Sequence, residues 1–190
     1  MRRNRRNGVL ALALIIAALA VMPACTQRQA ETGTSPQTAA AMTPTQRGEY
    51  LVVIMGCHDC HTPGAPYGAP DFKRTLAGSE LGWQGPWGVS YASNLTPDPG
   101  TGLGSYTDAE IERALRSGVK KNGSPIMPPM PWPNYARLSP EDMSAVIAYL
   151  RGIPPVMHKN LGPIPPGKAA SGAALTFPPP PAWDAPVVTQ

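Results

Sequence analysis

The chain has 190 residues, a length that suits one domain with tails, and it contains 16 basic and 12 acidic residues. Four of the basic residues lie in the first eight positions, where there is no acidic residue, so the remainder of the chain is formally neutral. A neutral chain lacks the basic surface that attracts nucleic acid, so we exclude nucleic-acid binding.

The N-terminus has the pattern of an export signal. Arginines precede the apolar run VLALALIIAALAVM, which is shorter than the about 20 residues that span a bilayer. The run ends in MPAC, which resembles a bacterial lipobox, although Met22 and Pro23 depart from the usual pattern. We therefore predict a signal peptide over residues 1–24 and lipidation of Cys25, which would tether a periplasmic protein to the membrane. The alternatives are an uncleaved signal anchor and an incidental cysteine.

A tether and a first helix are expected next. Residues 25–44 are small and polar without periodicity, which is typical of a flexible tether. Thr43 or Thr45 can cap a helix in which Leu51 and Ile54 fall at helical spacing. This helix leads directly into the stretch MGCHDCHTPG.

Residues 62–106 are rich in glycine, proline and aromatic residues and show no sustained period. We predict a long ordered loop rather than a sheet. Such a length without regular structure is unusual in a compact domain, so the loop needs something to wrap around.

Two well-marked helices follow. Thr107 and Glu110 form the capping box of the first, and Gly118 can end it. Ser139 caps the second, with Pro140 at its first helical position.

The predicted fold class is all-α, with three main helices and long loops in a domain over residues 45–156. The proline-rich tail over residues 157–190 is expected to lack regular structure, apart from polyproline-like segments. Three short helices bury little apolar area, and the chain has only two phenylalanines. Because a core this small usually needs a staple or a cofactor, we expect a large apolar ligand.

The stretch CHDCH is the attachment motif of c-type haem. Each thiol adds to one vinyl group of the haem, and the two intervening residues set the separation of the sulfurs. We therefore predict that Cys57 and Cys60 are covalent anchors and that His61 is the proximal iron ligand. His58, between the anchors, is expected to face solvent.

Two other kinds of site use the same residue types. A structural zinc site needs four ligands, and the sequence has no second C-x-x-C or H-x-x-x-H pattern. A thioredoxin-like dithiol requires a βαβ setting, whereas this motif follows a helix and precedes a loop. Both interpretations are weaker than haem attachment.

The sixth iron ligand is expected in the stretch SPIMPPMPWPNY, between the second and third helices. Its prolines fix φ and stiffen a segment that can cross the far haem face. Met130, between two prolines, is the better-held candidate and Met127 is the alternative, but either can instead pack the haem pocket. Met143 lies on a predicted helix face and is expected in the core.

From residue 47 to residue 156 the chain resembles a monohaem class I cytochrome c, and in particular the cytochrome domains in subunits of periplasmic alcohol and aldehyde dehydrogenases. The resemblance rests on three segments, GEYLVVIMGCHDCHTPG, YASNLTPDPGTGLGSYTDAEIERALRSGV and MPPMPWPNYARLSPEDMSAVIAYLRGIPPV. It implies a small cytochrome c-type fold around a single covalent haem c, since the chain has one C-x-x-C-H.

The resemblance also implies roles for particular residues. Met130 becomes the axial ligand, and the carbonyl of Pro63 orients the proximal imidazole. Tyr91 and Asn94 belong to a segment that lies near the haem edge. With both axial positions filled by protein, the iron transfers single electrons and the chain is not itself an enzyme.

The expected partners are redox proteins, with a dehydrogenase as electron donor and an oxidase or another cytochrome as acceptor. The membrane is contacted through the N-terminal anchor. The alternative is an electron-accepting subunit of a membrane-associated dehydrogenase complex, docked through the proline-rich tail. A haem sensor or peroxidase needs an open iron position, which the methionine-bearing stretch argues against.

Overall fold

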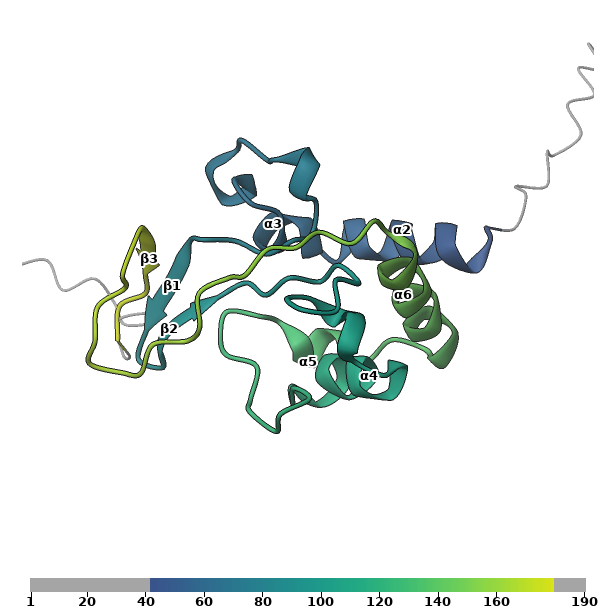
Figure 1. Ribbon diagram of the computed structural model, residues 1–190. Helices are drawn as coiled ribbons and strands as arrows, with labels where there is room; N and C mark the ends of the chain where they lie inside the picture. The colour runs from purple at the N-terminus through teal and green to yellow at the C-terminus, as the bar shows by residue number, and fades with distance from the viewer. Residues whose placement is uncertain (1–41, 180–190) are drawn as a thin grey trace, which may run out of the picture. The chain divides into compact units, whose positions relative to one another are not determined.

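The computed structural model describes residues 42–179, so the predicted signal peptide and Cys25 lie outside the described residues. The helices in this part of the chain are α2 (Pro44–Ile54), α3 (Cys57–His61), α4 (Asp108–Ser117), α5 (Trp132–Tyr135) and α6 (Pro140–Gly152) (Figure 1). The strands are β1 (Gly82–Gly85), β2 (Gly88–Tyr91) and β3 (Ala174–Thr176). Short 3-10 helices occupy Ala65–Tyr67, Phe72–Arg74 and Leu103–Ser105. Between residues 42 and 179, no helix has the length and apolar character to cross a membrane.

The three main helices predicted from the sequence are α2, α4 and α6, and their starts are confirmed. The side chains of Thr43 and Thr107 accept hydrogen bonds from the N–H groups of Gln46 and Glu110, which close capping boxes in return. Ser139 caps α6 in the same way through its hydroxyl. These bonds satisfy N–H groups that have no partner within the helix, so they determine where each helix begins.

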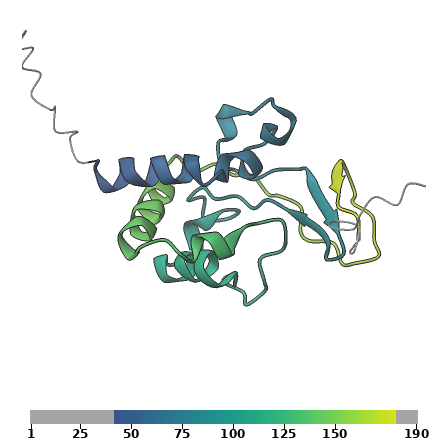
Figure 2. The same cartoon turned by 180° about the vertical axis from the view of Figure 1, so that it is seen from behind.

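The core lies where α2 and α6 cross (Figures 1 and 2). The two helices approach closely at Gly48, where a Cβ atom would overlap the carbonyl of Ala145. Two clusters of buried side chains result. The first contains Leu51, Val52, Leu76, Ala145, Val146 and Leu150, and the second contains Ile111, Met143 and Ile147. Met143 is 1% exposed, so its expected place in the core is confirmed.

The all-α prediction is not confirmed, because the domain also contains a small mixed sheet with strand order β2-β1-β3. β1 and β2 form an antiparallel hairpin inside the segment that was predicted to be loop only. β3, from the predicted tail, pairs in parallel with β1. The strand sequences GWQG and GVSY are too short and too rich in glycine to show the alternation by which strands are recognised.

The described part of the tail also departs from the prediction. Residues 156–177, which we call the C-terminal strap, run from the end of α6 to the sheet (Figure 1). Ile164 exchanges two backbone hydrogen bonds with Val89 of β2. Farther on, the ring of Phe177 lies against the rings of Trp83 and Trp87. The strap is therefore held by residues that are distant in sequence.

Candidate cofactor-attachment site

The predicted anchors and the predicted proximal ligand form the short helix α3. Gly56 leads into this helix with φ at 69°, in the left-handed region that glycine adopts without strain. Cys57, Cys60 and His61 stand at relative positions 1, 4 and 5, which share one face of a helix. Both cysteines are half-buried free thiols, and His61 is 8% exposed. One helix turn therefore presents two thiols and one imidazole in the same direction.

His58 is less exposed than the sequence predicts. Its side chain is half-buried, and its Nδ1 lies 3.4 Å from the hydroxyl of Thr62. Burial lowers the pKa of His58, although Asp59 and Glu49 act in the opposite direction. The residue therefore packs beside the attachment face without belonging to it.

The imidazole of His61 is oriented by one backbone carbonyl. Its Nδ1 lies 2.6 Å from the carbonyl oxygen of Ser93, so Nδ1 carries the proton that is donated and Nε2 carries the lone pair. Burial lowers the pKa of His61, which keeps the ring neutral. A neutral imidazole with Nδ1 bound to a carbonyl and Nε2 unprotonated is the form that binds a metal.

The structure assigns this orienting role to Ser93 and not to Pro63. The carbonyl of Pro63 accepts the N–H of Asp71 instead, at 2.8 Å. Ser93 follows His61 by 32 positions, and every residue has a carbonyl, so no sequence signal marks it. The side chain of Ser93 is exposed, and only its backbone serves the site.

The two thiols lack the acidity of a redox-active dithiol. Burial raises the pKa of Cys57 to about 12, and it also raises the pKa of Cys60. Reactive dithiols depend on a lowered thiol pKa, so the dithiol interpretation gains no support. In the described part of the chain, no three side chains of His, Cys, Asp or Glu converge as a metal site.

β2 binds the predicted distal side, and the chain that continues from β2 reaches His61 through Ser93. Ser90 donates its hydroxyl to the carbonyl of Pro128. Pro128 belongs to residues 126–131, which we call the methionine segment because it contains Met127 and Met130, both half-buried. The hairpin therefore holds the middle of the segment in which the sixth ligand is predicted.

The start of the methionine segment is fixed at the end of α4. The N–H of Ile126 donates to the carbonyl of Gly118, at 2.7 Å. Gly118 has φ at 66°, and a Cβ atom there would overlap the ring of Trp132. The methionine segment is thus held by contacts at Ile126, at Pro128 and at Trp132, which follows the segment. Met130 as ligand, with Met127 as the alternative, stays a prediction.

Tyr135, in α5, binds the end of α2 two residues before the attachment helix, and the sequence had not marked it as a site residue. Its hydroxyl donates to the carbonyl of Met55, at 2.9 Å, and the residue is 6% exposed. Burial raises the pKa of Tyr135 to about 12, with smaller contributions from Cys57 and Cys60. The one available signal was an aromatic residue shortly after Met130.

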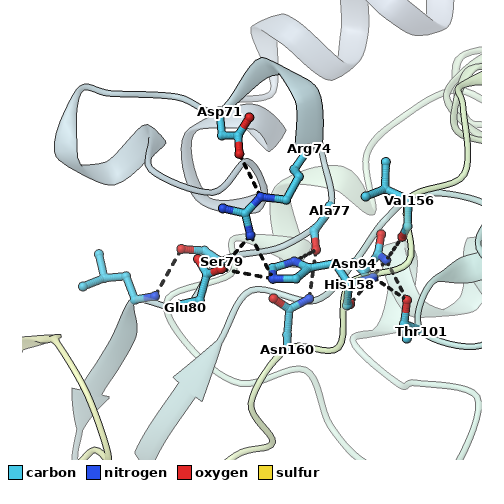
Figure 3. A network of polar contacts seen from close by, with 11 residues as sticks. Asp71, Arg74, Ala77, Ser79, Glu80, Asn94, Thr101, Val156, His158 and Asn160 are labelled. Carbon is cyan, nitrogen blue, oxygen red and sulfur yellow. Dashed lines mark hydrogen bonds and ion pairs between the residues drawn. The ribbon is translucent and has the colours of Figure 1, made fainter.

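Tyr91 and Asn94 flank Ser93 and differ in role. The hydroxyl of Tyr91 is buried without a hydrogen-bond partner among the described residues, which fits contact with a further polar group at a haem edge. The amide of Asn94 instead donates to Thr101 and Val156 (Figure 3). Its oxygen accepts the N–H of Thr96. The structure therefore makes Asn94 a positioning residue for the backbone next to Ser93.

These features fit a covalently attached haem. α3 supplies two thiols with the spacing of the attachment motif and an imidazole with its lone pair on Nε2. Tyr91, two residues before Ser93, adds a buried hydroxyl that has no hydrogen-bond partner among the described residues.

Comparison with known proteins agrees with this geometry. Residues 45–154 match the family model for cytochrome c. The chain is 39% identical over 121 residues to the cytochrome c subunit of a quinone alcohol dehydrogenase from Gluconobacter oxydans (strain 621H), covering 62% of this chain and 23% of the relative. It is 41% identical over 118 residues to the gluconate 2-dehydrogenase cytochrome c subunit of Pantoea cypripedii, covering 60% and 24%.

A further relative is a diheme cytochrome c-type protein of Cereibacter sphaeroides, 32% identical over 121 residues, covering 63% of this chain and 40% of the relative. The chain therefore spans about a quarter of the length of the dehydrogenase subunits named above.

Proposed function

Because the chain belongs to the cytochrome c family, we propose that it is an electron carrier with one covalent haem c, bound through Cys57 and Cys60. The observation that carries the proposal is the arrangement on α3. Two thiols and the buried imidazole of His61 share one helix face, and the carbonyl of Ser93 holds the imidazole in its metal-binding tautomer.

Haem supplies reversible one-electron chemistry between Fe(III) and Fe(II) when it is bound. The residues of the chain set the conditions for that chemistry. The cysteines would attach the group, and the backbone of Ser93 holds Nδ1 of His61, which leaves Nε2 free to bind the iron. The thioether of Met130 would act as a soft ligand, which would favour Fe(II) and raise the reduction potential.

The chain itself is proposed to be a carrier and not an enzyme. If His61 and Met130 both held the iron, they would leave no position at which a substrate could bind. Tyr91 is proposed to contact the haem edge, and this assignment is supported by its buried hydroxyl, which finds no hydrogen-bond partner within residues 42–179. Asn94 and Pro63 are not proposed as contacts, because their polar groups are bonded to protein partners.

The proposed partners are a dehydrogenase as donor and an oxidase or another cytochrome as acceptor. The names of the relatives favour a second candidate, in which the chain is the cytochrome subunit of a dehydrogenase complex. We propose a periplasmic location with lipid anchoring at Cys25 on the sequence pattern of the N-terminus alone. Co-purification from the native membrane separates the two candidates, because only a subunit remains with a catalytic partner.

Attachment is tested by haem staining after denaturing electrophoresis. The parent is expected to keep its haem, and Cys57→Ala combined with Cys60→Ala is expected to lose it. His58→Ala is the matched control within the same helix and should keep the haem. Haem that extracts from the parent into acidic organic solvent would contradict the proposal, and a haem-to-chain ratio of two would contradict the single haem.

A further inference from the structure

One short stretch of backbone contacts both segments that are proposed to ligate iron, and the C-terminal strap holds that stretch. We propose that the strap, residues 156–177, is a brace that positions both axial ligands through β2 and the residues after it. It would thereby help to set the reduction potential. The inference rests on the proposed function, since it requires an iron ligated by histidine and methionine.

β2 and the residues that follow it reach both sides of the site. The carbonyl of Ser93 orients His61, and the hydroxyl of Ser90 binds the carbonyl of Pro128 in the methionine segment. These two contacts arise three residues apart on one extended stretch. A displacement of this stretch therefore moves the proximal imidazole and the methionine segment together.

A second stretch of backbone lies beside the first. The N–H of Leu95 donates to the carbonyl of Leu76, and the N–H of Ser79 donates to the carbonyl of Ala92. Between these two bonds, the N–H of Gly78 donates to the carbonyl of His61 itself, at 2.7 Å. Residues 76–79 and 92–95 thus form a paired frame around the proximal ligand.

The strap binds one side of this frame through hydrogen bonds to buried side chains (Figure 3). The amide of Asn94, which is 2% exposed, donates to the carbonyl of Val156, at 2.8 Å. In return, the N–H of Val156 donates to the hydroxyl of Thr96, which is fully buried. Buried polar groups that lose such partners are costly, so this contact resists separation.

The strap also grips the other side of the frame, at the carbonyl of Ala77. His158 lies 2.8 Å from this oxygen through Nδ1, and Asn160 donates its amide to it at 2.9 Å. The packing is tight here, because a Cβ atom on Gly78 would overlap the amide of Asn160. The ring of His158 also faces Glu80, with its Nε2 3.0 Å from the carboxylate.

The far end of the strap fastens the hairpin. Ile164 pairs with Val89 of β2, and a Cβ atom on Gly88 would overlap the carbonyl of Ile164. Phe177 closes the strap, with its ring centroid 5.5 Å from that of Trp87. The strap is therefore bonded to the domain at both ends and in the middle. This is expected of a brace, whereas a free docking segment would lack such bonds.

The test removes the grip on Ala77 while leaving the proposed ligands intact. His158→Ala combined with Asn160→Ala is compared with Lys159→Ala, an exposed residue between them. Haem staining should be unchanged in both proteins. The double variant should lose most of the near-infrared band of sulfur-to-iron ligation, and its reduction potential should fall. Its reduced form should bind carbon monoxide at least about tenfold faster, as expected when two hydrogen bonds are lost.

A readout independent of the iron is hydrogen exchange. The amides of Gly78 and Leu95 should exchange about tenfold faster in the double variant, because the frame opens more often. His158→Gln keeps a donor for the carbonyl of Ala77 and should preserve the parental behaviour. Phe177→Ala, at the far end of the strap, provides a second variant that should shift the same readouts in the same direction.

The outcomes separate the brace from the proposed function. A parent without covalent haem would refute the carrier. The brace alone would be refuted if the parent has haem and a sulfur-ligation band, and if the double variant and Phe177→Ala both keep that band, the parental reduction potential and slow hydrogen exchange. A loss of stability with the band and the potential unchanged would likewise reduce the strap to a structural element.

Discussion

Replacement of Asn94 by alanine tests the hydrogen-bond network behind the proximal ligand. The Asn94 side chain is 2% exposed and hydrogen-bonds to four residues, one of which is the carbonyl of His158 at 3.5 Å. It donates to the Thr101 hydroxyl at 3.0 Å and to the Val156 carbonyl at 2.8 Å. It accepts the N–H of Thr96 at 2.9 Å and its hydroxyl at 2.8 Å. The substitution removes these bonds without adding bulk.

The loss of stability caused by Asn94→Ala depends on which of its hydrogen-bond partners keep another partner. The Val156 carbonyl can still accept from the Thr96 hydroxyl, and the Thr101 hydroxyl still accepts from the N–H of His158. The buried N–H of Thr96 loses its acceptor, and such a group costs about 1–3 kcal/mol. Adding the other weakened bonds, we expect Asn94→Ala to lower the free energy of unfolding by about 2–4 kcal/mol.

The assay is urea unfolding of the haem-containing protein, followed by circular dichroism. Asn122→Ala is the matched control, because Asn122 is exposed and its side chain accepts hydrogen bonds only from Ser124 in a local turn. Asn122→Ala should lower the free energy of unfolding by less than about 1 kcal/mol. Equal effects of the two substitutions would show that Asn94 does not clamp the proximal backbone.

Three further substitutions test other parts of the reasoning. Met130→Ala should abolish the near-infrared band, lower the reduction potential and let the reduced protein bind carbon monoxide, whereas Met127→Ala should change these little; the reverse pattern would move the ligand to Met127. Tyr135→Phe removes the bond to the carbonyl of Met55 and should cost about 1 kcal/mol in urea unfolding, with the band unchanged. Cys25→Ser should release the protein from the membrane fraction, and identical partition and mass of both proteins would disprove lipidation.

The strap changes how the second candidate function is viewed. In that candidate function alone, the proline-rich tail was expected to dock on a dehydrogenase. Residues 156–177 instead bond to the domain from which they emerge, at Asn94, Ala77 and Val89. The described part of the tail is therefore not a free docking segment, and the co-purification experiment tests directly whether a catalytic partner binds.

The sequence by itself determined the features that depend on near neighbours along the chain. The two cysteines and His61 lie within one helix turn, so their relation to a haem follows from spacing alone. The helix starts at Thr43 and Thr107 were likewise readable, because a capping box closes within four residues. Such interactions involve few residues and survive in almost any tertiary setting.

Only the tertiary structure decided which carbonyl orients His61, where the strap runs and that a sheet is present. Ser93 acts through its backbone, which has no side-chain signature. β3 finds β1 across a long stretch of chain, and Asn160 finds the carbonyl of Ala77 in the same way. Pairings of this kind carry a loop-closure cost that is repaid only when many contacts form together. No single residue announces them, because the partner is chosen by the packing of the whole domain.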